Sequence, residues 1–138
     1  MGWFDIPNAI RAALIADTQL NALVANRIHY QEIPAESQYP HIWFARTGRE
    51  QDDLLDASEE MTQERFSFEI AADKDCEAVV DRVIAVLDQF EGQVGARDVQ
   101  LVDIDDADDD YLFKSIGEGE PDYLHALQVT IFSVEQTA

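Results

Sequence analysis

The stretch ERFSFEIAAD, residues 64–73, alternates strictly between apolar and polar side chains. Its apolar face consists of Phe66, Phe68 and Ile70. A period of two is the pattern of a β-strand that buries one face. Residues 41–49 alternate in a similar way, so we predict that the two strands pair as a hairpin around a long acidic loop, residues 50–62.

Two main helices are predicted on either side of this hairpin. The first begins near Pro7, because proline suits the first turn of a helix, and it continues into a short helical piece that Asp17 or Thr18 caps. The second begins at Asp73 or Asp75 and ends at the next glycine. Its apolar stripe is formed by Cys76, Val79, Val80, Val83, Leu87 and Phe90.

Three further segments have the patterns of strands: residues 99–104, a short edge strand at 111–113 and a long final strand at 123–134. Strand pairs and helices follow one another without strict alternation, which favours the α+β class. We therefore predict a single α+β domain over residues 1–138. Its sheet should be mostly antiparallel, with about four strands, and should be packed by the two main helices.

The composition is that of a folded protein. Hydrophobic residues make up 46% of the 138 residues, which is enough to bury a core. No apolar run reaches the roughly 20 residues that cross a bilayer, and the first residues lack the pattern of a signal peptide. The single cysteine, Cys76, excludes an internal disulfide. We expect synthesis in a reducing cytoplasm and no contact with a membrane.

Charge is the most unusual bulk property. The chain has 29 Asp and Glu against 9 Lys and Arg, for a formal net charge of −20. Such a field repels nucleic acid and anionic membranes, and it disfavours sequence-specific DNA binding. Two interpretations remain: the charge keeps the protein soluble, or it forms a surface that nucleic acid passes without binding.

The densest charge is DIDDADDDY, residues 103–111. A calcium loop needs acidic ligands at positions 1, 3 and 5, Gly at 6 and Glu at 12. Counted from Asp106, positions 6 and 12 are Tyr111 and Gly117; counted from Asp103, position 5 is an alanine. The motif fails in both registers. We therefore predict no cofactor, although clustered carboxylates are compatible with weak Mg²⁺ or Ca²⁺ binding.

No other motif indicates an enzyme. General acid–base catalysis needs two carboxyls in different environments, whereas the carboxyls of this chain lie among like charges. Cys76 has acidic neighbours, which disfavour a thiolate. The histidines, His29, His41 and His125, are too far apart for a zinc motif. We predict no catalytic and no metal-binding residues.

Aromatic and acidic side chains remain as candidates for an interface or a channel surface. Trp3 and Phe4 precede the first helix, and they either cover the core or anchor a partner. Trp43 lies between Ile42 and Phe44, which suggests an apolar strand face beyond the needs of one core and hence oligomerisation. The candidates are Trp3, Phe4, Trp43, Asp52, Asp53, Glu59, Glu60, Asp105, Asp106, Asp108, Asp109 and Asp110.

Five stretches in order are similar to those of a known family: AIRAALIADTQLNALVANRIHY (9–30), IPAESQYPHIWFAR (33–46), ERFSFEIAAD (64–73), AVVDRVIAVLDQF (78–90) and YLHALQVTIFSV (123–134). The chain resembles the tail completion proteins of long-tailed bacteriophages and gene transfer agents, a family that includes tail terminators and tail-to-head joining proteins. The resemblance rests on an Arg-Ile-aromatic turn after the first helix and on a proline-bearing loop with a Tyr-Pro step. The matching residues are Arg27, Ile28, Tyr30, Pro34, Tyr39 and Pro40. The acidic run departs from the family pattern.

The resemblance implies a structural protein of the virion, in the neck region of the tail, made in the cytoplasm of a bacterial host. It also implies a ring, commonly hexameric, that caps the tail tube protein and contacts the head-connector protein while DNA passes through without specific binding. Residues 103–110 or 50–60 would then face the channel and repel phosphates. The main alternative is an acidic DNA mimic that binds a basic nucleic-acid-binding protein; a metal-dependent enzyme comes after it.

Overall fold

The computed structural model describes residues 4–31, 40–53, 60–72, 77–95, 97–112 and 123–135. The side chains of residues 52, 53, 60, 106–112, 123, 124 and 135 are left out of this description. Some predicted features lie outside the described residues: Trp3, Glu59 and the predicted helix start at residues 73–76.

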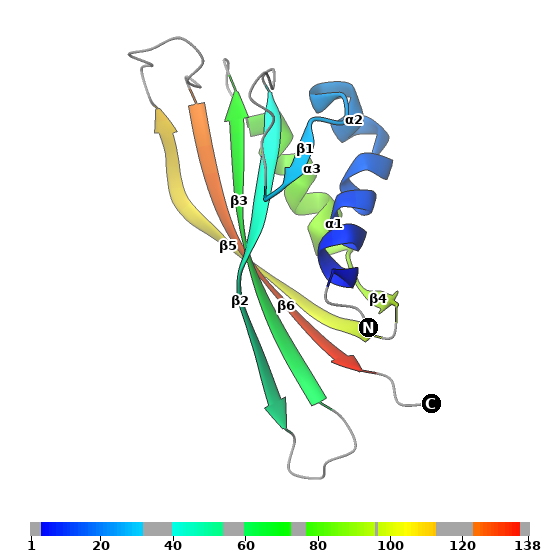
Figure 1. Cartoon of the computed structure of the whole chain (residues 1–138). Coiled ribbons are helices and arrows are strands. Elements are labelled where there is room, and N and C mark those ends of the chain that lie inside the picture. The colour runs from blue at the N-terminus through cyan, green and yellow to red at the C-terminus, as the bar shows by residue number, and fades with distance from the viewer. Residues whose placement is uncertain are drawn as a thin grey trace.

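The described residues form three helices, and these helices lie on one face of a sheet (Figure 1). They are α1 (Asp5–Ala16), α2 (Thr18–Val24) and α3 (Glu77–Asp88). The predicted cap of the second helix is confirmed, because the Asp17 carboxylate accepts a hydrogen bond from the Leu20 N–H at 2.9 Å. Ala25 ends this helix in the left-handed conformation, with φ 50°.

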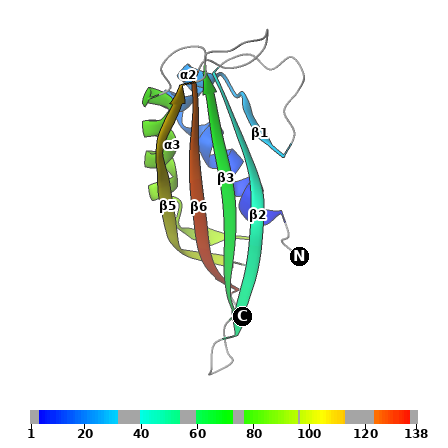
Figure 2. The ribbon, with the colours of Figure 1, turned by 90° about the vertical axis from the view of Figure 1, so that its left-hand side faces the viewer.

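Within the part of the chain that the structure describes, the sheet has six strands: β1 (Ile28–Tyr30), β2 (His41–Asp53), β3 (Glu60–Ala72), β4 (Gly92–Val94), β5 (Arg97–Leu112) and β6 (Tyr123–Glu135). Their order is β1-β2-β3-β6-β5-β4, and the four long strands run side by side (Figure 2). The β1–β2 pair is parallel and the other pairs are antiparallel. The prediction of about four strands packed by two main helices is therefore wrong: the sheet is mixed and larger, and three helices cover it.

The additional strands are β1 and β4, each of three residues. Segments this short have no measurable period, so only pairing with a longer neighbour defines them. Ile28 lies opposite Ile42 in the β1–β2 pair. In the β4–β5 pair, Gly92 lies opposite Val99, and its φ of +95° suits glycine at the turn from α3 into β4.

The described parts of both acidic segments lie in strands, which corrects the prediction of one long loop over residues 50–62. β2 continues to Asp53 and β3 begins at Glu60, so these strands occupy most of the expected loop at residues 50–62. β5 continues through the aspartate run, with a register irregularity between Asp106 and Asp110. Main-chain pairing places few demands on the solvent-facing side chains of a strand, so a carboxylate-rich sequence can form one.

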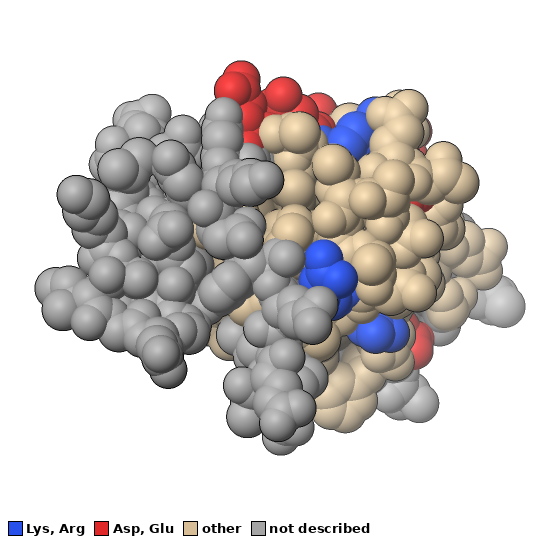
Figure 3. All heavy atoms as spheres, turned by 90° about the horizontal axis from the view of Figure 1, so that it is seen from above, with Lys and Arg blue, Asp and Glu red and all other residues tan. Residues whose placement is uncertain are grey.

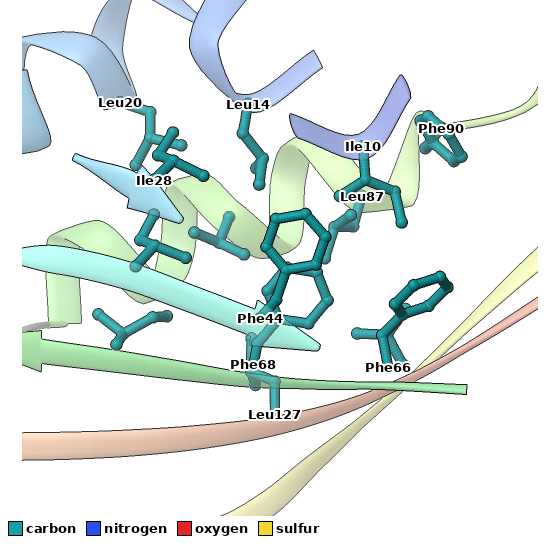
Figure 4. Packing of buried hydrophobic residues seen from close by; sticks show 14 of the residues in the cluster. Ile10, Leu14, Leu20, Ile28, Phe44, Phe66, Phe68, Leu87, Phe90 and Leu127 are labelled. Carbon is teal, nitrogen blue, oxygen red and sulfur yellow. The ribbon is translucent and has the colours of Figure 1, made fainter. Parts of the chain in front are cut away.

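The apolar core lies between the helices and the sheet (Figure 4). Phe44 of β2 and Phe68 of β3 stack, with ring centroids 4.9 Å apart and planes 7° apart. Ile10, Leu14 and Leu87 cover them from the helix layer, and all five side chains are fully buried. The apolar face predicted for residues 64–73 is confirmed.

The β2–β3 hairpin continues beyond the helix layer (Figure 1). On the side of the sheet that faces the helices, the buried row of β3 runs from Phe68 and Phe66 to Glu64 and Thr62. The row changes from apolar to polar where the helices end. The buried side chains of the projecting hairpin are therefore held by hydrogen bonds and ion pairs rather than by a hydrophobic core.

Candidate functional site

The aspartate run occupies β5 near one edge of the sheet. Asp103 and Asp105 are exposed and lie opposite Thr130 and Gln128 of β6. The intervening Ile104 is partly buried against the core, so the two exposed carboxylates lie on the opposite, helix-free side of the sheet, which we call the outer face. The predicted candidates Asp106, Asp108, Asp109 and Asp110 also belong to this strand.

The second acidic segment is at the other end of the sheet. Asp53 lies opposite Glu60 at the end of the β2–β3 hairpin, and Asp52 lies opposite Met61. Met61 pairs in turn with Val134, near the end of β6, whereas Asp110 pairs with His125, near its start. The structure therefore does not bring the two acidic segments together (Figure 1).

The predicted aromatic candidates lie on opposite sides of the sheet. Phe4 precedes α1 on the helix side and is 51% exposed. Trp43 lies on β2 opposite Glu69 and is partly buried. Its neighbours Ile42 and Phe44 point into the core, so Trp43 is on the outer face.

The arginines form a feature that the sequence reasoning missed: all seven make contacts within the chain. Four of these contacts join a guanidinium to a carboxylate: Arg82–Asp17 at 2.7 Å, Arg46–Glu64 at 3.1 Å, Arg65–Glu50 at 2.9 Å and Arg49–Glu64 at 3.5 Å. The others donate to neutral oxygens: Arg11 to Ile28 O and Arg27 to Pro40 O, both at 2.9 Å, and Arg97 to Ser133 Oγ at 2.8 Å. These cations stabilise the fold and leave many surface carboxylates unbalanced.

Arg97 is the most unusual of these groups, because it is 7% exposed and contacts hydroxyls. Its Nε donates to Ser133 and its Nη2 donates to Thr62 Oγ1. Both hydroxyl residues are fully buried. The side chain thus reaches from the start of β5 across β6 to β3, and it ties three strands together.

A pocket of about 330 Å³ lies between α1 and the end of α3, with Ala13, Asp17, Arg82 and Phe90 in its lining. Asp17 and Arg82 are bonded to each other by two hydrogen bonds, at 2.7 and 3.1 Å. The hydrogen bond from Arg82 lowers the pKa of the Asp17 carboxyl, and the same contact raises the pKa of the Arg82 guanidinium. This pair stays ionised at neutral pH and acts as a structural contact.

In the described parts of the chain, no three His, Cys, Asp or Glu side chains are grouped so that they could hold a metal ion. The weak Mg²⁺ or Ca²⁺ binding expected of the aspartate run stays a prediction. Within the same residues, none of the helices has the length and hydrophobicity that crossing a membrane requires.

The family model of tail completion protein gp17 matches residues 8–115. The match covers most of the chain, and the chain belongs to this family. Among solved structures, a chain from the virion of a native gene transfer agent (GTA) particle has a similar fold, with a TM-score of 0.69 and 15% sequence identity over 98% of this chain and 100% of that one. No curated protein has significant similarity to this sequence.

Family membership confirms the resemblance read from the sequence. The chain is a structural protein of a phage-type tail, and its location is the virion.

Proposed function

We propose that this protein completes the tail by forming a ring of six subunits on the end of the tail tube. The ring would offer its other side to the head-connector protein, and DNA would pass along its axis. The role is structural rather than catalytic. Membership in the tail completion family is the observation that carries this proposal.

The distribution of charge supports a channel that does not bind DNA. The seven arginines are engaged within the chain, whereas Asp103 and Asp105 are exposed. Phosphates gain affinity for a protein by exchanging their counterions for Lys and Arg. A lumen lined by β5 carboxylates, with few available cations, would repel the duplex and let it slide.

Charge reversal of the aspartate run tests this role. The variant Asp108→Lys with Asp109→Lys would place cations in the channel, so particles that carry it should assemble but release DNA more slowly. Asp81→Lys with Asp88→Lys makes the same change in charge on exposed positions of α3 and serves as the control. Normal DNA release from the β5 variant would contradict the channel assignment.

A further inference from the structure

Arg97 is a buried cation whose charge is not balanced by any described group. The residue is 7% exposed, and its hydrogen bonds go to the hydroxyls of Ser133 and Thr62. Hydroxyls are neutral, so they satisfy donors but do not neutralise the charge. A guanidinium that is removed from water is normally paired with an anion, because an unpaired buried charge is costly. In the described part of the chain, no carboxylate forms an ion pair with Arg97.

The neighbouring carboxylates that the structure describes have other contacts. Glu64, two residues from the hydroxyl of β3, contacts two arginines of β2. Asp98 follows the guanidinium residue on β5, points to the other face of the sheet and accepts a hydrogen bond from Gln100. Asp5 of α1 lies against Gly95. The missing counter-charge is therefore not supplied by these three carboxylates.

The guanidinium of Arg97 has one free end. Nε and Nη2 form one side of the planar group, and both donate to the buried hydroxyls. Nη1 has no hydrogen bond to a described residue, and it is not among the buried polar atoms that lack a partner. The end of the group, formed by Nη1 and Nη2, therefore reaches the surface with two parallel N–H donors. Two parallel donors match the two oxygens of a carboxylate.

The two hydroxyls hold this end of the guanidinium in place. Thr62 and Ser133 lie opposite each other on β3 and β6, and both are fully buried. An arginine side chain that is already fixed loses little conformational freedom when an anion binds to it. The free end of Arg97 is therefore organised for binding before any ligand arrives.

Cations outnumber carboxylates around Arg97, although the whole chain has a net charge of −20. The charged side chains described on the helix-facing side of the projecting hairpin and the adjoining start of β5 are Arg46, Arg49, Arg97 and Glu64. Elsewhere cations are sparse, and the described surface at the α2 end shows only small groups of Lys and Arg atoms (Figure 3). The surroundings of Arg97 thus attract an anion at short range.

We infer that Arg97 binds a carboxylate carried by an acidic side chain on an extended segment of a partner protein. A group that is 7% exposed can be reached by one slim side chain but not by the backbone of a DNA duplex. The rest of the chain also repels a polyanion, whereas a single carboxylate meets much less repulsion. A phosphate would leave some of its oxygens without donors here. The inference does not depend on the ring.

A titration of the wild-type chain followed by NMR tests the inference at one residue. The probe is the acetylated and amidated peptide Gly-Glu-Gly, and the matched control peptide is Gly-Gln-Gly. The acidic peptide should shift the Arg97 Nε–H resonance saturably and should bind about tenfold more tightly than the control. Inorganic phosphate, a short DNA duplex and formate are titrated in parallel at equal ionic strength.

Two matched variants support the same titration. Arg97→Lys keeps the positive charge but loses the two parallel donors, so binding measured at the Ser133 backbone amide should weaken about tenfold. Arg65→Lys makes the same change in the exposed pair with Glu50 and should leave binding unchanged. Equal losses in both variants would show that the peptide follows overall charge, which overturns the site.

The remaining outcomes separate the sources of the anion. No saturable shift at Arg97 in the wild-type chain overturns the inference. Tighter binding of phosphate or of the duplex overturns the choice of a carboxylate, and binding of formate without binding of the peptide overturns the partner segment. Glu135 lies opposite Arg97 in the β5–β6 pair. If the peptide binds only after Glu135→Gln, the carboxylate belongs to the chain itself and the inference is wrong.

Discussion

The Glu64 carboxylate lies 3.1 Å from the Arg46 guanidinium where the apolar core ends, and their side chains are 1% and 7% exposed. Arg49 approaches the same carboxylate at 3.5 Å. This contact joins β2 to β3 in the part of the hairpin that the helices do not cover. The contact holds the hairpin in place. Glu64 follows Phe68 and Phe66 in the buried row of β3, at the position where the apolar part of that row ends.

Removing this charge should destabilise the protein strongly. Glu64→Gln leaves Arg46 buried without its counter-charge, which costs about 3–5 kcal/mol of unfolding free energy. Glu50→Gln breaks the exposed pair with Arg65, whose side chains are 56% and 45% exposed, and it should cost less than about 1 kcal/mol. Urea unfolding measures both values, and similar costs for the two variants would show that the buried contact is not important.

The stacked pair Phe44 and Phe68 predicts a second stability effect. Phe68→Ala removes a fully buried ring and should cost about 3–5 kcal/mol. Phe68→Leu fills much of the same space and should cost clearly less. An alanine variant as stable as the leucine variant would mean that the helix layer collapses into the cavity without loss.

The network of Arg97, Thr62 and Ser133 should show coupling. Arg97→Met removes the donors to both buried hydroxyls, and Thr62→Val removes one acceptor. Each change alone should destabilise the protein, whereas the double variant should cost less than the sum, by about 0.5–3 kcal/mol. Additive losses in a double-mutant cycle would indicate that the contact contributes little.

The Asp17–Arg82 pair predicts a pH dependence. The contact lowers the pKa of Asp17 in the folded state, so its contribution to stability is complete above the unfolded value of about 4 and is lost as pH falls through the folded pKa. Asp17→Asn keeps a cap for α2 but loses the charge. The difference in unfolding free energy between wild type and this variant should be larger at pH 7 than at pH 3, and a constant difference would contradict the assignment.

The parts of the fold that the sequence predicted are those with a strong local period. Phe66 to Ile70 alternate, so the central strand was predictable, and Asp17 has the chemistry of a helix cap. The strands β1 and β4 could not be predicted from the sequence, because a segment of three residues has no measurable period. Their pairing depends on residues of other strands, such as Ile42 and Val99. Residues 50–53 were predicted to lie in a loop, since β propensity disfavours aspartate, yet pairing with β3 holds them in a strand.

The candidate surfaces were predictable only in part. Phe4 was predicted either to cover the core or to anchor a partner, Trp43 to lie on an apolar strand face beyond the needs of one core, and Asp105 to be part of the acidic surface. Leu101 was missed, because a leucine in an apolar strand pattern is normally buried. Its exposure follows from the register irregularity between Val99 and Leu101, which shifts it onto the outer face, and a local irregularity of this kind leaves no signal in residue spacing.

The ring itself is the central claim, and the mass of the purified protein in solution tests it most directly. Native mass spectrometry with and without millimolar Mg²⁺, followed by imaging of any large species, should find a closed hexameric ring. Mg²⁺ should favour the ring, because six copies of a −20 chain repel one another. A monomer under every condition that instead binds a basic nucleic-acid-binding protein would contradict the account and favour the DNA mimic.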